Sequence, residues 1–138
     1  SSLTMSKAEG YSGQGLYFAF NIVEDGWAGA WYSLANRNLS AYEGGTLSFW
    51  LKGDGSKSRF WVTLADAELD IFVYEIVVEG SGWQQIVIPL SEFQFLRTRG
   101  ENTDGLLTLR NMDSLAIDFL PLSVGEVIFD DIVLIAAQ

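Results

Sequence analysis

Trp50 and Trp61 are the residues whose type and spacing most directly suggest binding chemistry. Both lie in the stretch Leu47 to Leu64, LSFWLKGDGSKSRFWVTL, where apolar and polar residues alternate on either side of a Gly-Asp-Gly-Ser segment. This alternation predicts two half-buried strands joined by a tight polar turn. Both tryptophans then fall on the face turned away from the core, where an uncovered tryptophan costs hydrophobic free energy.

Two explanations fit this pair of tryptophans. In the first, a neighbouring strand or loop covers one or both of them. In the second, they form a flat aromatic platform for a ligand such as a sugar, because a pyranose ring presents a face of C–H groups that stacks on aromatic rings. The ring hydroxyls then need polar partners, and Lys52, Arg59 and Thr63 share the tryptophan face.

The remaining chain predicts further short strands and no long helix. Leu16 to Ile22 alternates so that Tyr17 lies opposite the core and joins the tryptophan surface, and the strand from Trp83 places Gln85 opposite its core face. Ile71 to Val78 is apolar on both faces, which leaves open whether Tyr74 or Glu75 faces the groove.

The strand pattern predicts the overall architecture. Ala65 to Asp70 is expected to be a solvated acidic turn, Asn36 to Gly45 to contain a turn of helix, and Gln94 to Gly105 to be a loop. Eight or nine short strands in one domain spanning residues 1–138 predict an all-β sandwich of two antiparallel sheets.

Charge and composition exclude several classes of function. A net charge of −10, with 18 acidic and 8 basic residues, argues against nucleic-acid or anionic-membrane partners and suits calcium. No apolar run approaches the length of a membrane span, and the N-terminus lacks a signal-peptide pattern. The chain has no cysteine and no histidine, which excludes thiol chemistry and Ser-His or Cys-His catalysis. Carboxylate-based hydrolysis would remain, but no strand face carries paired acids, so no enzymatic activity is expected.

The order of several motifs resembles a known family. LSFWLKGDG, a second strand, WQQIVIPLSEF, an arginine-bearing loop, LAIDF and a closing VIFDDIVL occur in this order between Gly15 and Leu134. Together they resemble the β-jelly-roll carbohydrate-binding modules of family 11 and their relatives. That superfamily of galactose-binding-like sandwiches also includes the complex I intermediate-associated proteins, whose resemblance implies the alternative of a protein-interaction or assembly domain.

The resemblance implies a non-catalytic module of a secreted, modular glycoside hydrolase. Such a module holds one polysaccharide chain, a β-glucan such as cellulose, in a concave sheet. Arg97 or Arg99 matches the arginine that follows the Ile-Pro strand, and Asp118 lies on the non-core face of a groove strand. The resemblance also implies a structural calcium near the meeting point of the termini, with Asp130 as a ligand and Glu9 or carbonyls of residues 11–15 completing the site, although the first strand of the family pattern looks short or missing.

Overall fold

The computed structural model describes residues 1–100 and 104–138, and in these residues the fold is a sandwich of ten strands. The all-β prediction is confirmed, with short 3₁₀ turns at Ser40–Tyr42 and Leu90–Glu92 and no α-helix in the described part of the chain. The strands are β1 (Ser2–Glu9), β2 (Gln14–Asn21), β3 (Ala28–Arg37), β4 (Thr46–Lys52), β5 (Arg59–Asp66), β6 (Asp70–Val77), β7 (Trp83–Pro89), β8 (Gln94–Thr98), β9 (Met112–Phe119) and β10 (Val124–Ile135).

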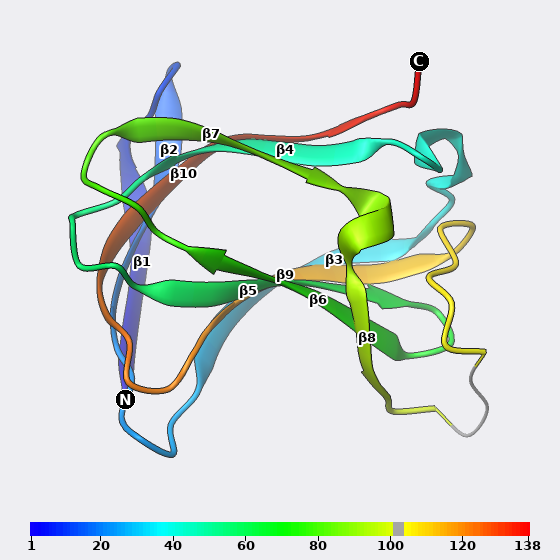
Figure 1. The fold of residues 1–138 in the computed structure, drawn as a ribbon, viewed down its shortest axis with the longest axis horizontal. Helices are drawn as coiled ribbons and strands as arrows, with labels where there is room; N and C mark the ends of the chain where they lie inside the picture. The colour runs from blue at the N-terminus through cyan, green and yellow to red at the C-terminus, as the bar shows by residue number, and fades with distance from the viewer. Residues whose placement is uncertain (101–103) are drawn as a thin grey trace.

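Two five-stranded sheets form the layers of the sandwich (Figure 1). The first, sheet A, has the order β1-β2-β10-β4-β7, and the second, sheet B, has the order β3-β9-β5-β6-β8. All neighbouring strands are antiparallel, as predicted. The first strand is eight residues long, so the expectation that it is short or missing was wrong.

The two tryptophan-bearing strands exist where they were predicted, but they do not form a hairpin. β4 pairs with β7 and β10 in sheet A, whereas β5 pairs with β6 and β9 in sheet B. The Gly-Asp-Gly-Ser segment therefore crosses from one sheet to the other. Its Asp54 accepts a hydrogen bond from the backbone N–H of Glu126 in β10. The backbone N–H of Gly55 donates to the carbonyl of Gly80, in the loop between β6 and β7. The crossing segment is therefore bonded to both of these parts of the chain.

The core is a layer of aromatic and aliphatic side chains from the inner faces of both sheets. Phe119 of sheet B stacks on Phe20 of sheet A with ring centroids 4.1 Å apart, and Phe60 contacts Phe129 across the sandwich at 5.3 Å. These four rings are almost completely buried. Because burial of each large ring contributes on the order of 2–3 kcal/mol, this layer holds the two sheets together.

Two segments predicted as loops differ from the expectation. Gln94–Thr98 forms β8, which pairs with β6 and extends sheet B. The acidic turn between β5 and β6 is not a simple solvated turn, because Asp66 and Asp70 are fully buried while Glu68 between them is exposed. Among the described residues, no helix has the length and apolar character needed to cross a membrane.

Candidate functional site

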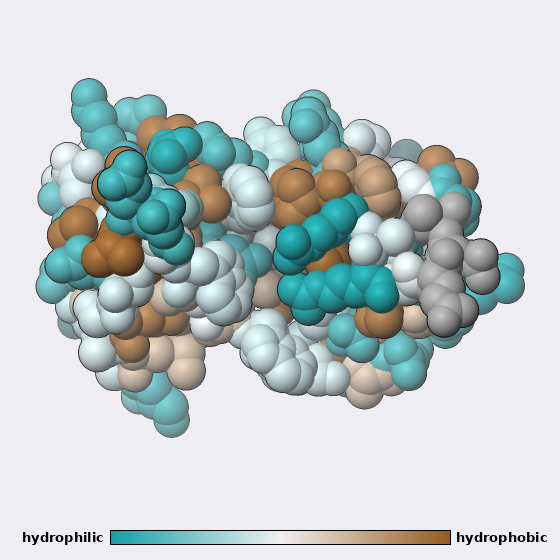
Figure 2. All heavy atoms as spheres, turned by 90° about the horizontal axis from the view of Figure 1, so that it is seen from below, coloured by the Kyte–Doolittle hydropathy of each residue, from teal (hydrophilic) through white to brown (hydrophobic). Residues whose placement is uncertain are grey.

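The outer face of sheet B carries a groove of about 630 Å³. Strands β3, β9, β5, β6 and β8 contribute to it, together with Arg99, which follows β8. Figure 2 views the molecule from this side, where elongated hydrophilic side chains lie across hydrophobic atoms beside a hollow in the surface. The groove is lined by both aromatic and charged side chains, among them Trp27, Trp31, Trp61, Arg97, Arg99 and Asp118.

Strand register explains why the floor of the groove is hollow. One cross-strand row runs from Gly29 through Asp118 to Trp61, and the next runs from Trp31 through Ala116 to Thr63. Small residues in these rows keep the floor low between the large aromatic side chains. Trp61 is half-buried, whereas Trp27 and Trp31 are 65% and 72% exposed. Exposed indoles beside a low floor are the geometry that a stacking ligand requires.

Asp118 lies in the floor and is held by a hydrogen bond. The hydroxyl of Thr63 donates to its carboxylate at 2.6 Å, and only 9% of the residue is exposed. A side chain on Gly29 would collide with this carboxylate and with the Ile117 carbonyl oxygen at 2.7 Å, so the glycine is required for the close approach of β3. Burial raises the pKa of Asp118, against the opposing effects of the Thr63 hydrogen bond and the positive charges of Arg99 and Arg97.

The two arginines line the groove from one end. Arg97 is in β8, opposite Ile71 of β6, and Arg99 follows the strand with its backbone N–H bonded to the carbonyl of Leu69 at 2.9 Å. Both side chains are exposed and close enough to Asp118 to influence its ionisation. The groove thus offers two guanidinium donors and one carboxylate acceptor around an aromatic surface, which suits a neutral ligand rich in hydroxyl groups.

Four of the predicted sugar-binding residues lie together in this groove: Trp61, Arg97, Arg99 and Asp118. Arg59 is on the same outer face but does not line the groove, and its guanidinium forms an ion pair with Glu75 at 3.6 Å. Tyr74 points the other way. It packs against the core and its ring lies 6.0 Å from that of Phe93, so Glu75 is the neighbour that faces outward.

Trp50, Tyr17 and Gln85 are not part of the groove, and the expectation of one shared platform with Trp61 was wrong. Alternation within each strand was read correctly, but β4, β2 and β7 belong to sheet A, whose outer face is on the opposite side of the sandwich. There the Tyr11 ring stacks on Trp50 at 3.7 Å with an interplanar angle of 9°. Tyr17 donates a hydrogen bond to Glu126, and Gln85 bonds to Ser48.

Trp27 and Trp31 are groove residues that the sequence analysis did not select. The segment from Trp27 to Leu34 alternates small and large side chains, a pattern that left its inner face ambiguous. The pairing of β3 with β9 resolves the ambiguity, because Trp31 lies opposite Ala116, which is on the outer face. The small residues opposite Trp31 and beside it were the available signal.

Asp130 and Glu9 were predicted as ligands of a structural calcium. Asp130 is buried, and its two carboxylate oxygens accept hydrogen bonds from the backbone N–H groups of Ser12 and Asp131. It therefore holds the loop that carries Tyr11 over sheet A. Glu9 is exposed, and the convergent acidic group found among the described residues contains neither side chain. Calcium coordination by Asp130, with Glu9 or the backbone carbonyls of residues 11–15, stays a prediction.

Known proteins similar to this chain share its fold. Residues 1–137 match the family described as carbohydrate binding domain (family 11). A family 11 carbohydrate-binding module from Clostridium thermocellum, solved in complex with a β-1,3-1,4-mixed-linked tetrasaccharide, is 27% identical with a TM-score of 0.85, covering 99% of this chain and 84% of that one.

Two further known proteins are similar to this chain. Endoglucanase H of Acetivibrio thermocellus is 29% identical in an alignment 138 positions long that covers 93% of this chain and 15% of that protein. The family 30 carbohydrate-binding module of a cellulosomal cellulase from Clostridium thermocellum shares the fold at a TM-score of 0.73 and 16% identity, with 98% of this chain and 83% of that one covered. The chain therefore spans a small part of the length of its curated relative.

Proposed function

This chain belongs to family 11 of the carbohydrate-binding domains, and on that premise we propose that the sheet B groove holds a β-glucan chain. The protein is a non-catalytic binding module, as predicted. The observation that carries the proposal is the placement of half-buried Trp61 beside the Thr63-bound carboxylate of Asp118, with Arg97 and Arg99 at the end of the same groove. The tetrasaccharide complex of the similar family 11 module supports a mixed-linkage glucan as the ligand.

The groove would bind a glucan through stacking and hydrogen bonds. The apolar face of a glucose ring lies on the Trp61 indole, while the Asp118 carboxylate accepts from ring hydroxyls and the arginines donate to ring and hydroxyl oxygens. Each aromatic contact adds about 0.5–1.5 kcal/mol beyond the area it buries, so a groove with few such contacts gives affinities in the micromolar range.

The biological role that follows is targeting. The matched region is a minor part of Endoglucanase H, which supports a module attached to a glycoside hydrolase. Holding the polysaccharide near such a catalytic domain raises the effective substrate concentration without any contribution to the chemical step. Because polysaccharide substrates are extracellular, the proposal includes a secreted parent enzyme.

Affinity electrophoresis tests the proposal. The domain is run through gels containing mixed-linkage β-glucan, xyloglucan, hydroxyethylcellulose, laminarin or xylan. We expect retardation by mixed-linkage β-glucan and by the soluble cellulose derivative, and reduced retardation of a Trp61→Ala variant. If no gel retards the protein, the glucan proposal is wrong and the protein-interaction alternative gains support.

The calcium predicted at Asp130 is part of this proposal as a structural ion. Its support is the buried position of Asp130 where the loop after β1 meets β10. An Asp130→Asn variant tests it by differential scanning calorimetry with calcium and with a chelator. A stabilisation by calcium that is unchanged in this variant would exclude Asp130 as a ligand.

A further inference from the structure

Strand β7 forms one edge of sheet A and pairs on one side only, with β4 (Figure 1). Its seven residues, Trp83–Pro89, include no charged side chain, and its pairing with β4 has no bulge. Natural edge strands usually carry charges, prolines or bulges, because an unprotected row of backbone N–H and C=O groups pairs readily with another strand. From Trp83 to Ile88, β7 has none of these protections.

The other three edge strands of the sandwich are protected in these ways. β1 carries Lys7 and Glu9. β8 is only five residues long, contains Arg97, and pairs irregularly with β6. β3 ends in Arg37, and its pairing with β9 is interrupted between Ser33 and Arg37. The unprotected edge of β7 is therefore an exception among the edge strands that the structure describes.

The register with β4 decides which backbone groups of β7 face outward. Pro89 lies opposite Thr46, and the backbone N–H of the next residue, Leu90, donates to the carbonyl of Gly45 at 3.0 Å. This bond makes Pro89 and Thr46 a non-hydrogen-bonded pair, which suits a proline because it has no N–H. Hydrogen-bonded and non-hydrogen-bonded pairs alternate along an antiparallel ladder, so every second residue before Pro89 also points its backbone groups away from β4.

Three N–H groups of β7 consequently face outward from the sheet. They belong to Trp83, Gln85 and Val87. Within residues 1–100 and 104–138, none of these N–H groups has a hydrogen-bond partner. The carbonyls of the same three residues point outward with them, so the edge offers donors and acceptors in the arrangement that a further antiparallel strand requires.

We propose that β7 pairs with β7 of a second copy of this chain, across a two-fold axis at Gln85. In this antiparallel pair Gln85 lies opposite Gln85 of the second copy, and Trp83 of each copy lies opposite Val87 of the other. Each of these pairs exchanges two N–H···O=C bonds, so all three outward N–H groups of each copy gain an acceptor. Pro89, which has no N–H to donate, falls outside the three pairs.

The side chains favour a second copy as the partner. Opposite residues of an antiparallel ladder carry their side chains on the same face, so the indole of Trp83 meets the side chain of Val87 twice, once on each side of the axis. Val87 is 52% exposed and Trp83 is half-buried, which leaves surface on both for this contact. Aromatic and β-branched residues form favourable cross-strand pairs, and the ladder brings no like charges together.

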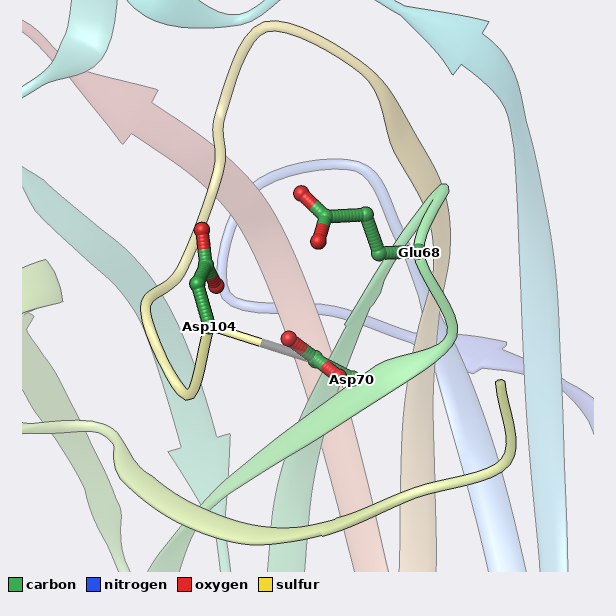
Figure 3. Close-up of side chains that lie close together, drawn as sticks. All are labelled: Glu68, Asp70 and Asp104. Atoms are coloured by element: carbon green, nitrogen blue, oxygen red, sulfur yellow. The ribbon is translucent and has the colours of Figure 1, made fainter. Parts of the chain in front are cut away.

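Net charge limits the strength of this contact. Each copy carries −10, so two copies repel each other at long range. Part of this charge is on the other sheet, where Glu68, Asp70 and Asp104 converge at the turn between β5 and β6 (Figure 3). Exposed Glu79 and Glu92 lie before and after β7, outside the proposed ladder. Because salt screens exposed charges, the pairing should strengthen as the ionic strength rises.

The proposed pairing also determines how the grooves are arranged. Paired residues keep their side chains on one face, so the two-fold axis is perpendicular to sheet A and both B sheets lie on the same side of the dimer. The two grooves then face the same way. On the glucan-binding function proposed above, the dimer would hold a polysaccharide through two grooves at once, which raises avidity without any new contact.

Analytical ultracentrifugation of the domain without glycan tests the pairing. A single edge strand buries less than the roughly 1,200–2,000 Å² of a standard interface, so we expect a weak dimer with a Kd of about 10 µM to 1 mM. Raising NaCl from about 20 mM to about 0.5 M should lower this Kd. Val87→Lys should raise it about tenfold or more, because both symmetry-related contacts with Trp83 are lost. Thr4→Lys is the matched control, since it places the same charge on the outer face of edge strand β1, and it should dimerise as the parent does.

Amide hydrogen exchange followed by NMR identifies the surface involved. The N–H groups of β7 that bond to β4 should be protected at every protein concentration, whereas those of Trp83, Gln85 and Val87 should gain protection only where the dimer is populated. Gln85→Pro removes an outward N–H without removing a bond to β4, and it should remain monomeric.

Either of two results would overturn the proposal. One is a parent that sediments only as a monomer at about 1 mM, which would leave the edge to an extended segment of another protein. The other is a dimer that persists in Val87→Lys and in Gln85→Pro without protection of the outward N–H groups. Because neither measurement uses a glycan, failure of this proposal is distinct from failure of the glucan-binding proposal.

Discussion

Replacing Trp61 and Trp50 separately by alanine distinguishes the two faces of the sandwich. Trp61 is in the groove of sheet B, half-buried by the protein with its remaining surface available to a ligand. Trp50 is also half-buried, but the ring of Tyr11 stacks on it at 3.7 Å on sheet A. The same substitution is therefore expected to affect ligand binding at one position and stability at the other.

The size of each effect follows from these surroundings. A sugar ring on Trp61 would cover on the order of 50 Å² of apolar surface, or about 1.2 kcal/mol, and stacking adds about 0.5–1.5 kcal/mol. Loss of about 1.7–2.7 kcal/mol corresponds to a Kd increased about 20- to 100-fold. Trp50→Ala removes the Tyr11 contact and part of a buried ring, which should lower the free energy of unfolding by about 2 kcal/mol.

Isothermal titration calorimetry with a mixed-linkage tetrasaccharide measures the first effect, and urea unfolding measures the second. Trp61→Ala should unfold nearly as the parent does, and Trp50→Ala should bind with a Kd within about twofold of the parent value. The reverse pattern, with Trp50→Ala losing affinity and Trp61→Ala retaining it, would refute the assignment of the groove to sheet B.

Three further substitutions test individual contacts. Asp118→Asn should weaken glucan binding about 10- to 150-fold, because hydrogen bonds to a charged group contribute about 1.5–3 kcal/mol. Burial raises the pKa of Asp118, so its contribution to stability is present below the unfolded-state pKa and is lost as the pH rises through the folded-state pKa. Urea unfolding measured against pH should show this decline in the parent and not in Asp118→Asn. The same pH profile in both proteins would contradict this assignment. Asp66→Ala leaves three backbone N–H groups without their acceptor and should cost about 2–4 kcal/mol in urea unfolding, whereas a loss under about 0.5 kcal/mol would mean that water replaces the carboxylate. Phe119→Ala removes the ring that contacts three other phenylalanines and should cost about 3–5 kcal/mol by the same measurement, unless the core collapses around the cavity.

Local sequence patterns predicted most strand positions because the alternation of apolar and polar residues is a property of each single strand. The segments around Phe49, Phe60 and Phe119 each alternate clearly, and each of these side chains is in the core. Membership of a sheet depends instead on pairing between distant strands. Trp50 and Trp61 were therefore correctly placed on outer faces, but the sequence pattern did not indicate that those faces belong to opposite sheets.

The groove could be predicted only in part for the same reason. Trp61 was predicted from the alternation of apolar and polar residues. Arg97, Arg99 and Asp118 were predicted from the resemblance to family 11, whose motifs occur in order along the chain. Trp31 was missed because β3 alternates small and large residues on both faces, so only its pairing with β9 identifies the outer side.

Burial of the turn between β5 and β6 was beyond the reach of the sequence pattern. Asp66 and Asp70 appear in a short acidic stretch, which is normally solvated. Residues 104–111, before β9, contact this turn through hydrogen bonds such as that between Thr108 and Asp66. Contacts between residues about 40 positions apart leave no periodic signal.

Chemical-shift mapping by NMR tests the central claim, that the sheet B groove holds the glucan, most directly. A ¹⁵N-labelled domain is titrated with the mixed-linkage tetrasaccharide while backbone, indole and guanidinium signals are followed. We predict perturbations at Trp61, Trp31, Arg97, Arg99 and Asp118, with the indole signal of Trp50 unchanged. Perturbations confined to Trp50, Tyr17 and Gln85 on sheet A would contradict the account.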